Sequence, residues 1–237
     1  MTLPVFRWDA PGPYEVVFST RLGGVSEGPF ESLNLGRKTG DDVERVDENR
    51  QRLCASMGAD EQRLALGYQT HSTVVNRAQA GSRDIPGDGL WTDEPGVPMV
   101  TLGADCVLMA LVRANGDPPA LAVLHAGWRG LADGVVQMGA QALGGRRLAA
   151  IIGPSIGPCC YEVREDVAER FRDQFGAAIV SRGKLDLWTA AEQAARAAGA
   201  THVERVDLCT ACRPDLFFSE RRTGKPRGTQ GVVGFVR

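Results

Sequence analysis

The fold is decided by residues 99–125, which read MVTLGADCVLMALVRANGDPPALAVLH. This stretch holds three short apolar runs, at 99–103, 109–112 and 121–124, with Gly, Asp and Pro between them. Runs of this length and composition are typical of buried β-strands. Because no helical pattern separates them, a doubly wound parallel sheet, in which strands and helices alternate, is not indicated.

Further strands are expected on both sides of this stretch, at 14–19, 73–76, 148–152 and 232–236. Apolar residues at helical spacing predict four helices. These cover 43–57, 131–142 with an end at Gly144 and Gly145, 167–175, and about 186–199. Strands and helices in this irregular order favour a mixed α+β fold.

Composition and charge limit the class of partner. The chain has 237 residues, of which 43% are hydrophobic and 24% charged, and its net charge is −2. A charge so near zero exerts no long-range attraction on nucleic acid or an anionic membrane. No apolar run approaches the roughly 20 residues of a membrane span, and the N-terminus lacks the pattern of a secretory signal. We expect a cytoplasmic protein whose partner is a small molecule, with an oligomeric state that the sequence leaves open.

The six cysteines are too sparse for a disulfide framework, so we expect free thiols in a reducing compartment. Cys209 and Cys212 have C-x-x-C spacing, but no second such pair exists to close a four-thiolate metal site, and we expect a structural role. Cys159 and Cys160 lie in a Gly- and Pro-rich segment that predicts a shaped loop. Cys54 falls within a predicted helix and is expected to pack in the core.

Two of the three histidines lie in unusual surroundings. His71 precedes a predicted strand, His125 ends another, and Cys106 lies at the edge of a third, next to loops where rigid scaffolds present reactive side chains. Two imidazoles and one thiolate match a catalytic zinc site with three protein ligands and one open position. Their wide separation in sequence requires tertiary convergence, and the alternative is a hydrogen-bonded core or loop histidine. His202, just after a predicted helix, is expected to be of that ordinary kind.

Several segments occur in a characteristic order and spacing. They are QTH (69–71), GDG (87–89), ADC (104–106), HAGWRG (125–130) and IGPSIGPCCYE (152–162), with further matches at 19–26, 32–36, 48–50, 92–93, 209–212 and 216–222. Together they resemble the YfiH family over essentially the whole chain. Two departures stand out: Leu108 occupies a position where the family usually has proline, and the segment 224–230 is longer than usual.

The resemblance implies a single domain over residues 1–237, folded as a layered α-β-β-α sandwich with mixed sheets. It places the metal on His71, Cys106 and His125. It implies a purine nucleoside enzyme that phosphorolyses inosine, adenosine and 5′-methylthioadenosine to base and ribose 1-phosphate, with adenosine deaminase activity as well. Family members have also been called multicopper polyphenol oxidases, laccase-domain proteins and peptidoglycan-editing factors.

The residues favour zinc over multicopper chemistry. A multicopper oxidase needs on the order of ten imidazole ligands, and three histidines cannot supply them. A single Cu²⁺ at the same three ligands is chemically compatible. Zn²⁺ with an open coordination position lowers the pKa of bound water toward about 7, which suits deamination at C6 of adenine.

Phosphorolysis also needs groups that hold phosphate and nucleoside. Arg21 and Arg129 are candidate anion contacts, because the guanidinium fork suits phosphate. Asp105, beside the predicted cysteine ligand, is expected to orient a ligand or act as a base. Asn34 is a candidate hydrogen-bond partner of ribose or purine, and Gln69 is expected to share the pocket of the metal ligands.

Two alternatives use the same atoms differently. A Cys106 thiolate activated by His125 as base, with Asp105 orienting that base, would make a metal-free cysteine hydrolase, acting for example on a murein precursor. Alternatively, the protein is a binding module whose zinc only stiffens a loop. Structural zinc usually has four protein ligands, and three are identified here, which favours catalysis.

Overall fold

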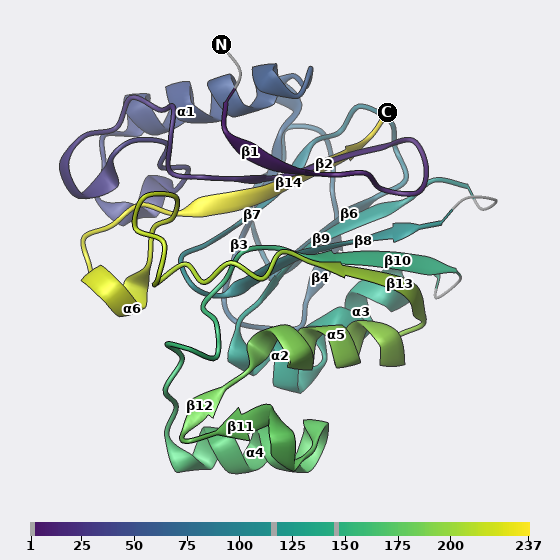
Figure 1. Cartoon of the computed structure of the whole chain (residues 1–237). Helices are drawn as coiled ribbons and strands as arrows, with labels where there is room; N and C mark the ends of the chain where they lie inside the picture. The colour runs from purple at the N-terminus through teal and green to yellow at the C-terminus, as the bar shows by residue number, and fades with distance from the viewer. Residues whose placement is uncertain (1–2, 115–117, 145–146) are drawn as a thin grey trace.

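The chain folds into four layers, with two mixed sheets packed face to face and helices on both outer faces (Figure 1). The computed structural model describes residues 3–114, 118–144 and 147–237. The first sheet runs β1 (Val5–Trp8), β2 (Tyr14–Ser19), β14 (Gln230–Val236), β7 (Met99–Gly103), β3 (Ala65–Tyr68), β5 (Arg83–Pro86). The second runs β13 (Ala200–Arg205), β10 (Leu148–Ile152), β8 (Val107–Arg113), β9 (Leu121–Ala126), β6 (Gly89–Thr92), β4 (Val75–Arg77).

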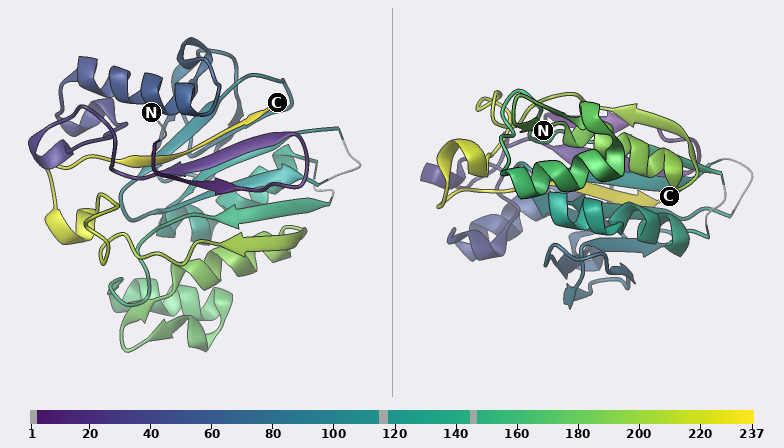
Figure 2. Two further views of the ribbon diagram at one scale, coloured as in Figure 1. Left: turned by 45° about the horizontal axis from the view of Figure 1, so that its top comes forward. Right: turned by 90° about the horizontal axis from the view of Figure 1, so that it is seen from below.

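The helices lie on opposite sides of this pair of sheets. They are α1 (Val43–Ser56), α2 (Trp128–Asp133), α3 (Val135–Ala142), α4 (Glu165–Phe175), α5 (Leu187–Ala197) and α6 (Glu220–Thr223). Figure 2 shows α1 beyond the first sheet and α2, α3, α4 and α5 beyond the second. A two-stranded sheet, β11 (Val180–Ser181) and β12 (Lys184–Leu185), lies beside α4, and short 3-10 turns cover Gly28–Phe30, Arg37–Thr39, Glu61–Arg63 and Ala177–Ile179.

Both sheets mix parallel and antiparallel pairs. β3 runs parallel to β5 and β7, β4 to β6, and β10 to β13, whereas the other neighbours run antiparallel. The expected α+β class and the layered α-β-β-α sandwich are therefore confirmed.

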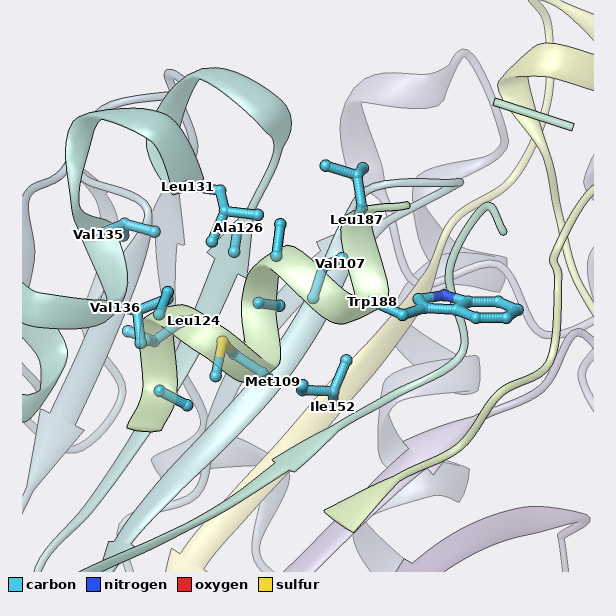
Figure 3. Packing of buried hydrophobic residues seen from close by; sticks show 14 of the residues in the cluster. Val107, Met109, Leu124, Ala126, Leu131, Val135, Val136, Ile152, Leu187 and Trp188 are labelled. Carbon is cyan, nitrogen blue, oxygen red and sulfur yellow. The ribbon is translucent and has the colours of Figure 1, made fainter. Parts of the chain in front are cut away.

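Side-chain alternation along β8 explains why a continuous apolar run forms a central strand. Met109 and Leu111 face the helices, whereas Leu108 and Val112 face the other sheet. Leu108, the departure from the usual proline, is thus a buried contact between the sheets. Figure 3 shows Leu131 of α2, Val136 of α3 and Trp188 of α5 covering the helical face.

Three of the seven predicted strands have the observed bounds, namely those of β2, β7 and β10. Three others, predicted at 109–112, 121–124 and 232–236, are longer in the structure by up to three residues. The strand expected at 73–76 is shifted, because β4 covers Val75–Arg77. The strands β1, β3, β5, β6 and β13 were not predicted. The first four have only four residues each, and β13 is mostly polar, so their pairing partners rather than their own composition hold them in the sheets.

Three predicted helices correspond to α1, α4 and α5. The fourth, 131–142, is wrong as one continuous helix. Gly134 takes a φ of 99° and divides it into α2 and α3, because only glycine adopts the left-handed region without strain. Met138, expected on the buried face, is exposed, and the predicted end at Gly145 lies outside the described residues. Within the described ranges no helix is long and apolar enough to cross a bilayer.

Candidate metal centre

Two loops and one strand bring the predicted metal ligands together. His71 lies between β3 and β4, Cys106 in the turn from β7 to β8, and His125 within β9. Their ligand atoms all lie within 4.8 Å of one another, and Cys106 Sγ is 4.0 Å from His71 Nε2. The imidazole rings are 5.0 Å apart between centroids and meet at 80°. The tertiary structure thus brings these three residues together, as the predicted metal site requires.

Asp88 orients the two histidine ligands. Its carboxylate is fully buried and lies 2.8 Å from His125 Nδ1. A carboxylate can only accept here, so His125 carries its proton on Nδ1 and turns Nε2 toward Cys106 and His71. Asp88 also accepts backbone hydrogen bonds from Thr70, His71 and Ser72, at 3.0, 3.0 and 2.6 Å. One carboxylate thus fixes both imidazole ligands.

The electrostatics favour ionised groups despite burial. Burial raises the pKa of Asp88, but hydrogen bonds from His125, Ser72 and Thr70 outweigh it and hold the pKa well below its usual range. Burial also raises the pKa of Cys106, yet the neighbouring His125 and His71 lower it to about 6. Burial lowers the pKa of His125, while the Cys106 thiolate and Asp88 raise it to about 9. Without a metal, Cys106 and His125 therefore form a thiolate–imidazolium pair at neutral pH.

Unusual backbone conformations place two of the loops. His71 has a φ of 60° and Asp105 a φ of 95°, both in the left-handed region that non-glycine residues rarely adopt. The Asp105 carboxylate accepts hydrogen bonds from Thr210 Oγ1 at 2.6 Å and from the Arg221 backbone N–H at 2.7 Å. These hydrogen bonds stabilise the strained turn on which Cys106 lies.

Gly127, just before α2, leaves room for the ligands. A Cβ at this position would lie 2.8 Å from His71 Cδ2 and 3.2 Å from Cys106 Sγ. Any side chain would push two of the three ligands away. A soft N, N, S donor set with an ordered carboxylate behind one imidazole and a glycine beside it fits a transition metal such as zinc or copper.

The ligands open into a cavity of about 410 Å³. Its lining includes the cationic side chains of Arg221, Lys225 and Arg227. A second cavity of about 350 Å³ adjoins it and shares Gln69, Leu102, Lys225, Arg227 and Thr229, so the two form one groove along residues 225–229. Two buried polar atoms on this shared wall, Arg227 Nε and Thr229 Oγ1, have no hydrogen-bond partner in the structure. Buried polar atoms that lack a partner are costly.

Two further predicted residues lie at the site. Gln69 lines both cavities, and its side-chain amide pairs with the backbone of Leu102 in both directions, at 2.6 and 2.8 Å. Asp105 lines the metal cavity, but both its oxygens are already bonded. Asp105 therefore fits the expected role of orienting the metal ligand Cys106 better than the role of a base. For the cysteine-hydrolase alternative, Asp105 was expected to orient His125. That expectation is wrong, because the carboxylate bonded to His125 is that of Asp88.

The other three predicted residues have different surroundings. Asn34 is fully buried, and its amide is bonded to Thr39, Asp41 and the backbone of Gly36 and Thr229, so no ligand can use it. Arg21 donates to the carbonyls of Glu31 and Pro214 and lines neither cavity.

Arg129 is exposed and lies in a separate hollow beside Tyr161 and Arg221, next to the metal cavity rather than in it. The structure therefore assembles the groove's cations from residues that the sequence analysis did not select. Lys225 and Arg227 belong to the unusually long segment 224–230, and that departure was the signal that could have identified them.

This chain is similar in sequence and in structure to several known proteins. A family model described as multi-copper polyphenol oxidoreductase laccase matches residues 15–236. Purine nucleoside phosphorylase PA4543 of Pseudomonas aeruginosa is 36% identical over 228 residues, covering 92% of each chain. Purine nucleoside phosphorylase YfiH of Escherichia coli is 32% identical and covers 93% of each chain. The crystal structure of Neisseria meningitidis protein NMB0706 superposes with a TM-score of 0.87 at 32% identity, covering 100% of this chain and 99% of that one.

Proposed function

Because this chain belongs to the YfiH family of multi-copper polyphenol oxidoreductase laccase-like proteins, we propose that it is a zinc-dependent purine nucleoside phosphorylase. The relatives from Pseudomonas aeruginosa and Escherichia coli are named purine nucleoside phosphorylases. The single observation that supports it most in this chain is the placement of His71, Cys106 and His125 at one end of a cationic groove. The proposed substrates are inosine, adenosine and 5′-methylthioadenosine.

The groove suits both reactants. In phosphorolysis a phosphate oxygen bonds to C1′ of the ribose while the C1′–N9 bond breaks and its electron pair goes to the purine. Arg227 and Lys225 are the proposed phosphate contacts, since both are cationic and both line the two cavities. The exposed Tyr68 ring in the adjoining cavity offers a face for the base. This assignment replaces Arg21 and Asn34.

Zinc at the three ligands would supply Lewis-acid stabilisation of developing negative charge. The protein's own residues do the positioning: Asp88 orients His125, Asp105 holds the turn of Cys106, and Gly127 keeps the space beside His71 open. Copper at the same ligands is the competing assignment. Metal analysis of protein expressed without added metal distinguishes the two.

Adenosine deamination is proposed as a second activity of the same cavity. It requires a group that carries protons to and from the purine. Two carboxylates line the metal cavity among the residues that the structure describes, and both oxygens of Asp105 are occupied. That leaves Glu220, which is paired with Arg227, as the proposed proton carrier.

The deciding experiment incubates purified protein with inosine, with and without phosphate, and follows hypoxanthine and ribose 1-phosphate by chromatography. The His71→Ala variant runs alongside. Phosphate-dependent release of base that is lost in the variant supports the proposal. Release that is independent of phosphate, or no release at all, contradicts it.

One observation favours a second candidate, a cysteine hydrolase. Asp88, His125 and Cys106 form a connected acid–imidazole–thiol series, and the pKa of Cys106 lies near 6 in the absence of metal. A hydrolase of this kind would keep its activity after chelation and lose it in Cys106→Ala. A phosphorylase that needs zinc would lose activity in both cases and regain it with zinc only in the wild type.

A further inference from the structure

Four cysteines gather at a second place, away from His71, Cys106 and His125. Cys159 and Cys160 lie in the loop after β10, and Cys209 and Cys212 in the loop after β13. All four sulfurs lie within 4.8 Å of one another. β10 and β13 are parallel neighbours, so both loops leave the same edge of the sheet. The sequence-based expectation that Cys209 and Cys212 lack a second pair is wrong, because the vicinal pair supplies it across the sheet edge.

We propose that these four thiolates form a second zinc site with a structural role. Tetrahedral zinc with Zn–S bonds of about 2.3 Å holds its four sulfurs about 3.8 Å apart. Here Cys212 Sγ lies 3.5 Å from Cys159 Sγ and 3.4 Å from Cys160 Sγ. These separations are close to the tetrahedral edge and far longer than a disulfide bond of about 2.05 Å. A closed set of four protein ligands is the pattern of structural rather than catalytic zinc.

Positively charged side chains and one backbone N–H lie around the four cysteines. Each sulfur that binds gives up its proton, and four thiolates around Zn²⁺ carry a net charge of −2. The backbone N–H of Gly157 donates to Cys209 Sγ at 3.3 Å. Cationic side chains hold the two loops: Lys184 donates to the carbonyl of Cys159 at 2.7 Å, Arg221 to that of Cys160 at 3.4 Å, and Arg222 to that of Thr210 at 2.7 Å. Such cations offset the charge of a tetrathiolate site.

The proposed site lies behind one wall of the groove. Thr210, between Cys209 and Cys212, donates to Asp105, which holds the turn of Cys106. Tyr161, next to Cys160, lines the metal cavity. Zinc on the four cysteines would therefore tie together two loops that shape the first site. The inference depends on the cysteine geometry alone and is independent of the proposed phosphorylase activity.

The test counts zinc per chain by mass spectrometry of metals, in protein purified under reducing conditions. We expect two zinc ions in the wild type, one in Cys212→Ser, one in His71→Ala and none in the double variant. Cys159→Ser, at an exposed ligand, provides an independent second variant, and circular dichroism checks that each remains folded. Cys54→Ala, at the buried cysteine of α1, is the matched control and should keep two.

Cobalt supplies a readout that does not depend on stoichiometry. In His71→Ala, added Co²⁺ should give the intense sulfur-to-metal charge-transfer absorption of four thiolates, and Cys212→Ser in that background should abolish it. Zinc content unchanged in both Cys212→Ser and Cys159→Ser would overturn the proposal. So would a disulfide among these four cysteines in the reduced preparation, seen as a peptide mass lower by two hydrogens.

Discussion

At the scale of single residues, Asp88 has the widest influence on the candidate metal centre. It bonds the ring of His125 and the backbone of His71, so it sets the orientation of two ligands at once. Carboxylates placed behind a metal-binding histidine typically contribute 10- to 100-fold to metal affinity or activity. The same residue would orient the base of a cysteine hydrolase, so its position is compatible with both candidate functions.

Asp88→Asn should therefore weaken metal binding at this centre by roughly 10- to 100-fold. In the place of Oδ2, the amide nitrogen cannot accept the hydrogen bonds of Thr70 and Ser72. In the place of Oδ1, it cannot accept those of His71 and His125. Competition with a chromophoric chelator measures the affinity. Asp133→Asn, in an exposed ion pair with Arg170, is the matched control and should leave affinity unchanged. Equal affinities for Asp88→Asn and wild type would show that the carboxylate has no orienting role.

The Cys106–His125 pair predicts a pH dependence of the metal-free protein. The pKa of Cys106 is about 6 and that of His125 is about 9, so both groups are charged between these values. The ion pair is lost when Cys106 takes up a proton below this range or His125 loses one above it.

Alkylation of Cys106 by iodoacetamide, followed by peptide mapping, reports the thiolate directly. In metal-stripped wild type the rate should rise with a midpoint near pH 6, and in His125→Asn the midpoint should move up toward the ordinary thiol value of 9. A midpoint that is the same in both proteins would contradict the ion pair.

At the scale of elements, the junction between β9 and α2 determines whether the ligands fit. Gly127 has no room for a Cβ, because His71 Cδ2 would lie 2.8 Å from it. Gly127→Ala should lower zinc content at this centre and destabilise the protein by about 1–3 kcal/mol through overpacking. In a His71→Ala background the same change should cost measurably less, since the clashing ring is gone. Denaturant unfolding of the four proteins measures this coupling, and additive effects would contradict the clash.

The segment 225–229 is the second element that matters for function. Arg227→Ala should raise the KM for phosphate about 10- to 100-fold, as expected for loss of a charge-assisted hydrogen bond. Arg129→Ala, in the neighbouring hollow, should raise it less, and an unchanged value there would exclude Arg129 as a phosphate contact. Initial rates at saturating inosine and varied phosphate provide both values. A larger effect for Arg129→Ala than for Arg227→Ala would reverse the assignment.

At the scale of the whole molecule, the apolar core between the second sheet and α2, α3 and α5 stabilises the fold, and the fold positions the loops of the metal centre. Met109 is fully buried in that core, whereas Met138 of α3 is 43% exposed. Met109→Ala should cost about 2–5 kcal/mol of unfolding free energy, because it leaves a cavity. Met138→Ala should change it by less than about 0.5 kcal/mol. Urea titration compares the two, and similar losses would contradict this description of the core.

What the sequence determined by itself is what depends on local chemistry. The apolar runs in 99–125 indicated strands without intervening helices, which follows from side-chain hydrophobicity, a short-range property. The residue types of His71, Cys106 and His125 matched the ligand preference of a metal, but the resemblance to the YfiH family was needed to assign it to them. Helix boundaries were accurate where caps and periodicity agreed, and failed at Gly134, where a single glycine bends the chain.

Only the tertiary structure decided which residues meet. Asp88 reaches His125 because β6 pairs with β9, and Cys159 and Cys160 meet Cys209 and Cys212 because β10 pairs with β13. Asn34 and Arg21 have the right chemistry for a ligand but are occupied by neighbouring loops. Strand pairing joins residues that are far apart in sequence, and the free energy of that pairing comes from burial of whole sheets. No local pattern contains that information.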